Sequence, residues 1–118
     1  MVPGRTLGAV DIVEFLSQRI GEDEAAAKSL LTDRTLSKSG EWYEQRLLLE
    51  CEAKRRLIQV VEAARQSALT AMVTESVDGG SGDGGWAPRS LDWMERSLRA
   101  VALPYVDHPD FNEDWLRL

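Results

Sequence analysis

The sequence predicts an all-α protein, an elongated helical hairpin or three-helix bundle with a long central helix and a short C-terminal helix. Two observations lead to this fold class. Apolar residues recur at helical spacing in three separate segments, and the longest segment contains neither Gly nor Pro from residue 41 to residue 75. No segment predicts a strand. Because the chain has 118 residues, we expect a single domain with one core.

The first helix is expected over residues 11–31. Asp11 and Glu14 form a capping box, in which each side chain bonds a free backbone N–H group of the first turn. Val10 can pack on Phe15 as a hydrophobic staple. The residues that share the apolar face of this helix are Ile12, Leu16, Ile20, Ala27 and Leu31.

The central helix is expected over residues 41–75, after a connection at residues 32–40 that is rich in turn-forming residues. At about 1.5 Å per residue this helix is roughly 50 Å long, whereas a compact domain of this size has a diameter of only about 35 Å. Either the helix breaks near residues 67–70, or the fold is elongated and its exposed end pairs with another chain. We favour the second interpretation, which predicts a homodimer through the 41–75 helix.

The C-terminal part begins with residues 76–87, which contain most of the chain's glycines and predict a flexible linker. A third helix is expected over residues 88–103, where Pro104 follows its end. Its apolar seam consists of Leu91, Met94, Leu98 and Val101. A second capping box, Asp110 with Glu113, predicts a short final helix over residues 111–117.

Charge and hydropathy exclude several classes of protein. The 14 basic and 20 acidic side chains give a net charge of −6, which disfavours direct binding to nucleic acid. No apolar run approaches the roughly 20 residues of a membrane span, and no signal peptide is recognisable, so we expect a cytoplasmic protein. The acidic run 22–24 and the basic run 54–56 are expected to be solvated, with Glu50–Lys54 and Glu52–Arg56 pairs.

The side chains that could carry chemistry are few. Cys51 is the only cysteine, so the chain can form no internal disulfide, and its place on an apolar stripe indicates a buried residue. His108 is the only histidine, and Asp107 beside it could orient its ring. The pattern Gly80-x-Gly82-x-x-Gly85 follows a helix instead of a strand, which argues against a dinucleotide site. We therefore assign no catalytic residue, metal ligand or cofactor.

Aromatic residues supply the candidates for partner binding. Trp93 and Phe111 are expected to lie in the core, whereas Trp86 adjoins the linker and has little core to join. The partner-binding candidates are Tyr105, Asp107, His108, Phe111, Trp115 and Trp86.

Three segments carry a resemblance to a known family. Residues 102–111 contain Leu-Pro-Tyr and Asp-His-Pro and are followed by Trp115; residues 11–27 include Val-Glu-Phe-Leu and Glu-Asp-Glu-Ala; residues 52–56 read Glu-Ala-Lys-Arg-Arg. Together these segments resemble a family of small actinobacterial and actinophage proteins of unknown function. The resemblance implies an actinobacterial or phage setting and an accessory role.

These observations predict a non-enzymatic accessory protein that binds another protein, which would be a host factor if a phage encodes the chain. One alternative is an acidic decoy that blocks a nucleic-acid-binding protein, since the excess of acidic residues lies toward the C-terminal end. A more remote alternative is a small enzyme centred on His108 with Asp107.

Overall fold

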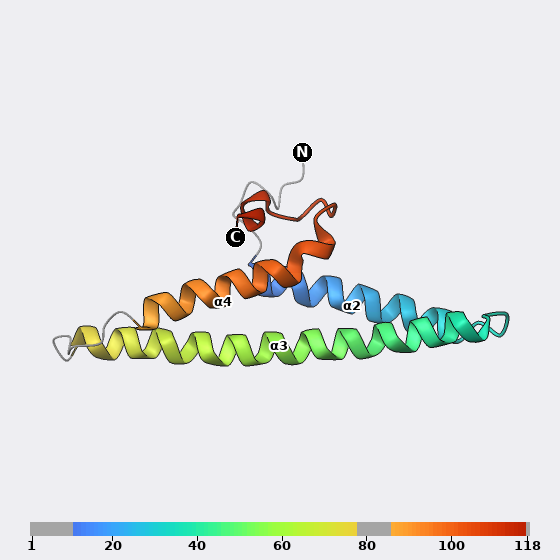
Figure 1. Cartoon of the computed structure of the whole chain (residues 1–118), viewed down its shortest axis with the longest axis horizontal. Helices are drawn as coiled ribbons and strands as arrows, with labels where there is room; N and C mark the ends of the chain where they lie inside the picture. The colour runs from blue at the N-terminus through green and yellow to red at the C-terminus, as the bar shows by residue number, and fades with distance from the viewer. Residues whose placement is uncertain (1–10, 78–85, 118) are drawn as a thin grey trace.

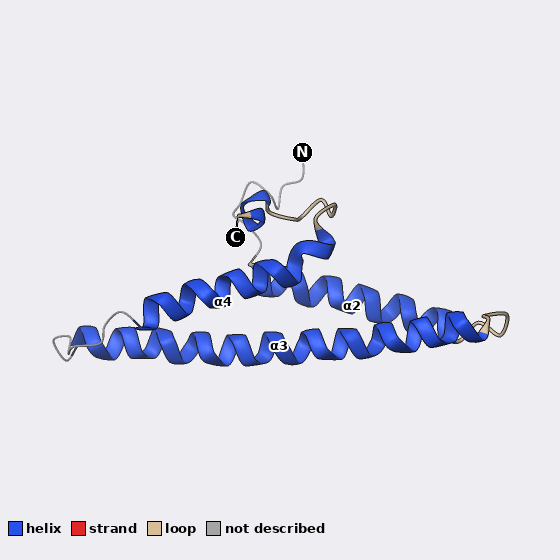
Figure 2. Cartoon of the chain, viewed as in Figure 1, coloured by secondary structure: helices blue, strands red, loops and turns tan. Residues whose placement is uncertain are grey.

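The computed structural model describes residues 11–77 and 86–117, with side chains for residues 11–74 and 88–117. These residues form three α-helices, α2 (Ile12–Leu31), α3 (Lys38–Val77) and α4 (Trp86–Ala102), and two short 3-10 helices, η1 (Leu103–Tyr105) and η2 (Glu113–Leu116). No strand occurs among them (Figure 2). The predicted all-α fold class is therefore confirmed.

The long helix α3 is the base on which the other two helices lie (Figure 1). α2 runs antiparallel along the N-terminal half of α3, α4 runs antiparallel along its C-terminal half, and α2 and α4 meet over its middle. The chain measures 65 × 35 × 20 Å with a radius of gyration of 18.5 Å, whereas a compact domain of this length has a radius of about 13 Å. The prediction of an elongated fold is confirmed, and α3 continues without a break through residues 67–70.

The central helix is longer than predicted at both ends. It begins at Lys38 because Ser37 caps it. The side-chain hydroxyl of Ser37 accepts a hydrogen bond from the N–H of Gly40 at 3.1 Å, and the backbone carbonyl of Ser37 accepts one from the N–H of Glu41 at 2.8 Å. Two residues at each end of the expected linker 76–87 are helical. The rest of that linker, including the Gly80-x-Gly82-x-x-Gly85 pattern, lies outside the described residues.

The two predicted capping boxes are wrong in their side-chain bonds. Asp11 occupies the N-cap position of α2, but its side chain makes no capping bond, and Val10 lies outside the described residues. The predicted helix 111–117 is the 3-10 helix η2, and its N-cap is Asn112, which accepts the N–H of Asp114 at 2.9 Å. Asp110 is not the cap because η2 begins at Glu113, and the residue before it is Asn112, whose backbone has the extended conformation usual for an N-cap.

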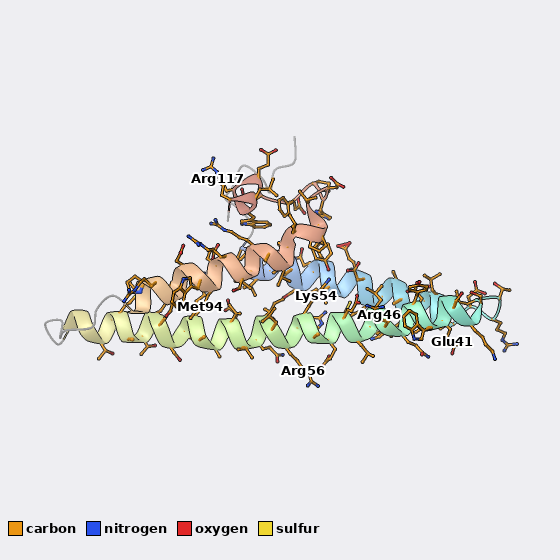
Figure 3. The ribbon with its side chains drawn as sticks, viewed as in Figure 1. Glu41, Arg46, Lys54, Arg56, Met94 and Arg117 are labelled. Carbon is orange, nitrogen blue, oxygen red and sulfur yellow. The ribbon has the colours of Figure 1, made fainter. Side chains whose placement is uncertain are left out.

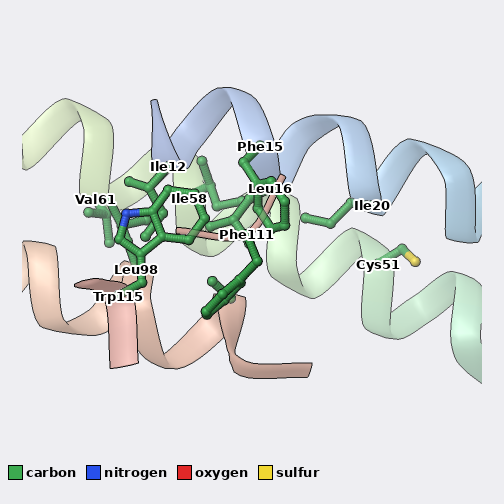
Figure 4. Packing of buried hydrophobic residues seen from close by; sticks show 11 residues of the cluster. Ile12, Phe15, Leu16, Ile20, Cys51, Ile58, Val61, Leu98, Phe111 and Trp115 are labelled. Carbon is green, nitrogen blue, oxygen red and sulfur yellow. The ribbon is translucent and has the colours of Figure 1, made fainter. Parts of the chain in front are cut away.

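The core lies where the three helices meet (Figure 4). Its buried members are Ile12, Phe15, Leu16, Ile20, Cys51, Ile58, Val61, Leu98, Ala102, Phe111 and Trp115, so the expected burial of Phe111 is confirmed. The expected burial of Trp93 is wrong, because this side chain is 64% exposed. The seam of α4 that faces α2 and α3 passes through Met94 and Leu98, and Trp93 lies on the side of the helix away from it.

None of the helices that the structure describes is both long enough and apolar enough to cross a membrane.

Candidate functional site

Residues 103–117, called the tail below, fold back over the junction between α2 and α4 (Figure 1). Pro104 lies in η1, where its ring ends the α-helical hydrogen-bond pattern of α4. Successive turns follow, closed by backbone bonds from Val106 to Leu103 and from His108 to Tyr105 at 3.1 and 2.9 Å. The tail is thus a compact, backbone-bonded segment.

The tail docks through aromatic contacts with one side chain of α2. Phe15 is fully buried, and four tail rings surround it. The distances between ring centroids are 6.2 Å to Tyr105, 5.5 Å to His108, 6.0 Å to Phe111 and 5.0 Å to Trp115. Three of these pairs are edge-to-face, the geometry that the quadrupoles of aromatic rings favour. Burial of these rings holds the tail on α2.

Arg19 joins α2 to the tail through polar contacts. Its side chain is only 11% exposed, and its guanidinium lies 5.4 Å from the centroid of the Phe15 ring. Nη1 contacts both ring nitrogens of His108, with 3.0 Å to Nδ1, and lies 3.9 Å from a carboxylate oxygen of Asp110. Nη2 pairs with Glu22 at 2.6 Å. A buried cation with these partners clamps the turn of the tail at residues 108–110.

Tyr105 connects the tail to both α2 and α3. Its hydroxyl donates to Asp23 Oδ2 at 2.9 Å and accepts from Lys54 Nζ at 3.3 Å. In Figure 3, Lys54 projects from α3 toward α2. Burial raises the pKa of Tyr105 well above its usual value, and the bond to the Asp23 carboxylate raises it further. The phenol is therefore a fixed hydrogen-bond donor.

A paired acid and base adjoin this contact, each one residue further along its helix: Glu24 on α2 and Arg55 on α3. Arg55 donates to both carboxylate oxygens of Glu24, at 2.9 Å from Nε and 2.6 Å from Nη2. The hydrogen bond from Arg55 lowers the pKa of Glu24, and the same bond raises the pKa of Arg55. This bidentate pair fixes the register of α2 against α3.

These contacts correct the prediction that residues 22–24 and 54–56 are simply solvated. Every acid of the first run has a basic or phenolic partner, and Lys54 pairs with Tyr105 instead of Glu50. The predicted Glu52–Arg56 pair is confirmed at 2.9 Å. The structure therefore brings together all three segments that carry the family resemblance: residues 22–24 of α2, residues 54–55 of α3, and the tail.

Sequence reasoning missed Arg19, Asp23 and Lys54 as members of this cluster. One signal was present in the sequence. Arg19 follows Phe15 by four residues and Leu16 by three, so it shares the apolar face of the first helix, where an unpaired charge would be costly. Lys54 likewise lies on the seam between Cys51 and Ile58.

A surface groove of about 490 Å³ runs along the outer side of the tail. It is lined by Val106, His108, Phe111, Glu113, Asp114, Leu116 and Arg117. Val106 and Leu116 are exposed apolar side chains, and Phe111 lies below them in the core. Arg117 lies 4.0 Å from Asp114, which leaves the Glu113 carboxylate without an ion pair among the described residues. The lining of the groove is thus about half apolar and half polar, and Glu113 and Asp114 make its rim acidic.

The predicted partner-binding residues differ in their exposure. Phe111 and Trp115 are buried in the core, and Tyr105 and His108 are half-buried in the contacts given above. Asp107 is exposed. Trp86 begins α4, but its side chain lies outside the described residues. The structure thus places His108 and Phe111 in the wall of the groove.

His108 and Cys51 are the single histidine and the single cysteine of the chain. The described hydrogen bonds of the His108 ring are with Arg19 and with the N–H of Asp110, which donates to Nδ1 at 3.0 Å; none is with Asp107. Cys51 is buried, and burial raises the pKa of its thiol, so it stays protonated. No group of three or more His, Cys, Asp or Glu side chains suited to a metal ion occurs in the described part of the chain.

The fold and this cluster define an elongated helical protein whose C-terminal tail is clamped over the crossing of its helices. The chain belongs to a family of unknown function (DUF6221), whose model matches residues 9–117. The match includes the tail and the side chains of α2 and α3 that hold it, Phe15, Arg19, Asp23 and Lys54, called the clamp below. Neither a curated protein nor a solved structure matches the sequence.

Proposed function

We propose that this protein is a non-enzymatic accessory protein of an actinobacterial cell or its phage, and that it acts by binding another protein through the groove of the tail. For a phage-encoded chain, the partner is a host factor. A homodimer formed through the central helix is the companion proposal. The observation that supports partner binding is the groove itself, whose wall contains two exposed apolar side chains, Val106 and Leu116.

The chemistry of the groove indicates the kind of partner. Apolar side chains left open beside a well-packed segment are typical of an interaction surface. Because Val106 and Leu116 are already about half buried, covering the rest of each on binding is worth roughly 1 kcal/mol. Glu113 and Asp114 lie at the rim, and Asp107 is exposed nearby, against the single positive charge of Arg117. The groove therefore suits a segment with an apolar anchor and a flanking basic residue.

The buried rings of the tail support the groove from beneath, and Phe111 also forms part of its wall. Phe111 and Trp115 pack on each other at 5.2 Å and on Phe15, so their replacement would disrupt the fold together with any binding. The groove is therefore tested through its exposed residues, which can be changed without opening the core.

The test is affinity capture from an actinobacterial lysate with the tagged protein and two groove variants, Val106→Glu and Leu116→Glu. The matched control is Leu30→Glu, because Leu30 is an equally exposed leucine at the far end of α2. We expect one dominant protein that the wild type and the control retain at high salt and that both groove variants lose. Equal capture by all four proteins would contradict the groove as the binding site.

The same experiment separates the acidic decoy from this proposal. A decoy holds its partner by charge, so capture would weaken steeply with salt and would be competed by duplex DNA. Capture that survives high salt and added DNA would reject the decoy.

A further inference from the structure

The long helix α3 has a second face that α2 and α4 do not cover. Its residues are all exposed and follow one another at alternating spacings of four and three. This outer face consists of Trp42, Arg46, Leu49, Ala53, Arg56, Val60, Ala63, Ser67, Thr70 and Thr74. The side that packs on α2 and α4 has the same spacing, as in Leu47, Cys51, Ile58 and Val61. Two such seams on one helix are the pattern of a helix that packs in a coiled-coil manner on both sides.

The composition of the outer face is unusual for a surface in contact with water. Trp42 is 54% exposed, Leu49 71% and Val60 67%. Between residues 57 and 74 the only charged residues are Glu62 and Arg65, which pair with each other at 3.2 Å and do not belong to the face. A solvated helix carries charged residues on its outer side. The part of the outer face from residue 57 to residue 74 carries none over five turns, which indicates a surface that another molecule covers.

The distribution of side-chain size along the face favours a second copy of the same chain as that molecule. The large residues, Trp42 and Leu49, lie in the N-terminal half, and the small residues Ser67 and Thr74 lie in the C-terminal half. In an antiparallel pair centred near residue 58, Trp42 of each copy lies opposite Thr74 of the other, and Leu49 lies opposite Ser67. At these two positions large side chains meet small ones, which suits close packing. Nearer the centre the paired residues are closer in size, Arg56 with Val60 and Ala53 with Ala63.

A shallow hollow agrees with this register. It has a volume of about 530 Å³ and is lined by Gln66, Ser67, Thr70, Ala71 and Thr74. This is the part of the face that an antiparallel copy would bring against Trp42 of the partner subunit. Trp42 can fill it, because an indole ring that is half-exposed in the single chain gains burial there.

Charge disfavours the parallel alternative. In a parallel pair Arg46 would lie against Arg46 of the partner subunit, and Arg56 against its own copy, which sets like charges together in the interface. In the antiparallel pair Arg46 lies opposite Thr70, about 36 Å along the axis from its own copy, whereas Arg56 lies opposite Val60 and only about 6 Å along the axis from its own copy. Arg46 is therefore the residue that disfavours the parallel pair. Each arginine already has a partner in its own chain, Glu50 at 3.2 Å and Glu52 at 2.9 Å, so neither needs one from the second copy. Figure 3 shows Arg56 on the side of α3 away from α2 and α4.

The size of the face is sufficient for a dimer. From residue 42 to residue 74 the helix extends about 48 Å, and a strip about 10–12 Å wide offers roughly 500 Å² on each copy. Two copies then bury roughly 1,000 Å², the lower limit for a specific interface.

We infer that the outer face of α3 is an antiparallel homodimer interface. The inference deepens the proposed homodimer by assigning its face and orientation, and it does not depend on the groove of the tail.

Light scattering over micromolar concentrations tests the interface. We expect twice the chain mass of 13.2 kDa for the wild type and the single mass for Val60→Glu and for Ser67→Glu, with unchanged helical circular dichroism. The matched control is Ala100→Glu, an exposed alanine of α4, which should remain dimeric. A monomeric wild type, or dimers that survive both charges, would overturn the inference. The groove variants Val106→Glu and Leu116→Glu should remain dimeric, so loss of partner capture and loss of dimerisation are distinguishable.

Disulfide formation tests the orientation in a Cys51→Ala background. In the antiparallel register Ala53 of one copy lies opposite Ala63 of the other. The two copies of Ala53 are about 15 Å apart, which is too far for a disulfide. We expect mild oxidation to cross-link a mixture of Ala53→Cys and Ala63→Cys chains and to leave either variant alone uncross-linked. Cross-linking of Ala53→Cys by itself would show a parallel pair and overturn the inference.

Discussion

Replacing Tyr105 by phenylalanine tests whether the polar cluster of Tyr105, Asp23 and Lys54 holds the tail in place. The change removes only the hydroxyl, which donates to Asp23 at 2.9 Å and accepts from Lys54 at 3.3 Å. The ring and its edge-to-face contact with Phe15 are kept. Any loss of stability therefore measures the polar contacts alone.

The expected loss follows from the charges of the two partners. A hydrogen bond to a charged group contributes about 1.5–3 kcal/mol to stability. The Asp23 carboxylate that loses this bond would have to accept a hydrogen bond from water instead. Asp23 and Lys54 are half-buried, so solvent can replace part of the bond, and we expect a decrease of about 1–2 kcal/mol in the free energy of unfolding. For a chain of this length that corresponds to a Tm lower by roughly 4–8 °C.

Urea and thermal unfolding, with Tyr43→Phe as the matched control, measure this loss. Tyr43 is exposed, and its described contact is the ring of Trp42 at 5.0 Å, so its hydroxyl should contribute less than about 0.5 kcal/mol. If Tyr105→Phe is as stable as Tyr43→Phe, the polar cluster does not clamp the tail and the reasoning is refuted.

The pH dependence provides a second measurement of the same side chain. Because burial and the bond to Asp23 raise the pKa of Tyr105 above its ordinary value of 10.0, the unfolded chain releases the phenol proton before the folded chain does. The unfolded state then binds fewer protons, so the free energy of unfolding declines as the pH rises above about 10. Tyr105→Phe should lack this part of the decline, and parallel alkaline curves for the two proteins would contradict the assigned burial.

Three further predictions concern the clamp and the core. Arg19→Met keeps the stem of the side chain but removes its bonds to the tail, so hydrogen exchange in residues 103–117 should accelerate by a factor of about 5–150, equivalent to 1–3 kcal/mol; unchanged exchange would count against the clamp. Glu24→Gln should cost less than about 1 kcal/mol at neutral pH, since its pair with Arg55 is partly exposed. The same variant should lose less stability than the wild type as the pH falls. In the wild type the bond from Arg55 lowers the pKa of Glu24 below 4.5, and its contribution to the free energy of unfolding is lost as the pH falls through that lowered pKa. Urea unfolding between pH 3 and pH 7 measures both effects. Phe15→Ala should cost about 3–5 kcal/mol, whereas Trp93→Ala, at an exposed ring of α4, should cost less than about 0.5 kcal/mol; equal losses in urea would contradict the assigned core.

The helices of this protein could be predicted from the sequence because their signals are local. Apolar residues at spacings of three and four define α2, α3 and α4 within two or three residues at each end. The length of the central helix expected over residues 41–75 also predicted the elongated shape, since a helix of roughly 50 Å cannot fit within a compact domain of 118 residues.

The ends of the elements were less predictable because several neighbouring residues can serve as caps. Asp110 and Asn112 are both good N-cap residues, and the backbone that leaves the preceding turn decides which of them reaches η2. Likewise, Ser37 extends α3 beyond the expected start, although Gly40 follows it. The backbone angles that select one cap over another cannot be predicted from the residue types alone.

What the sequence by itself determined is therefore the set of helices, the elongated shape and a tail in which aromatic residues are concentrated. The tertiary structure alone decided which polar groups meet. His108 and Arg19 are 89 positions apart in the chain, and Tyr105 and Asp23 are 82 apart. No periodic pattern links such positions, because their contact depends on where α2 and α4 cross over α3 and how the tail turns back after Pro104.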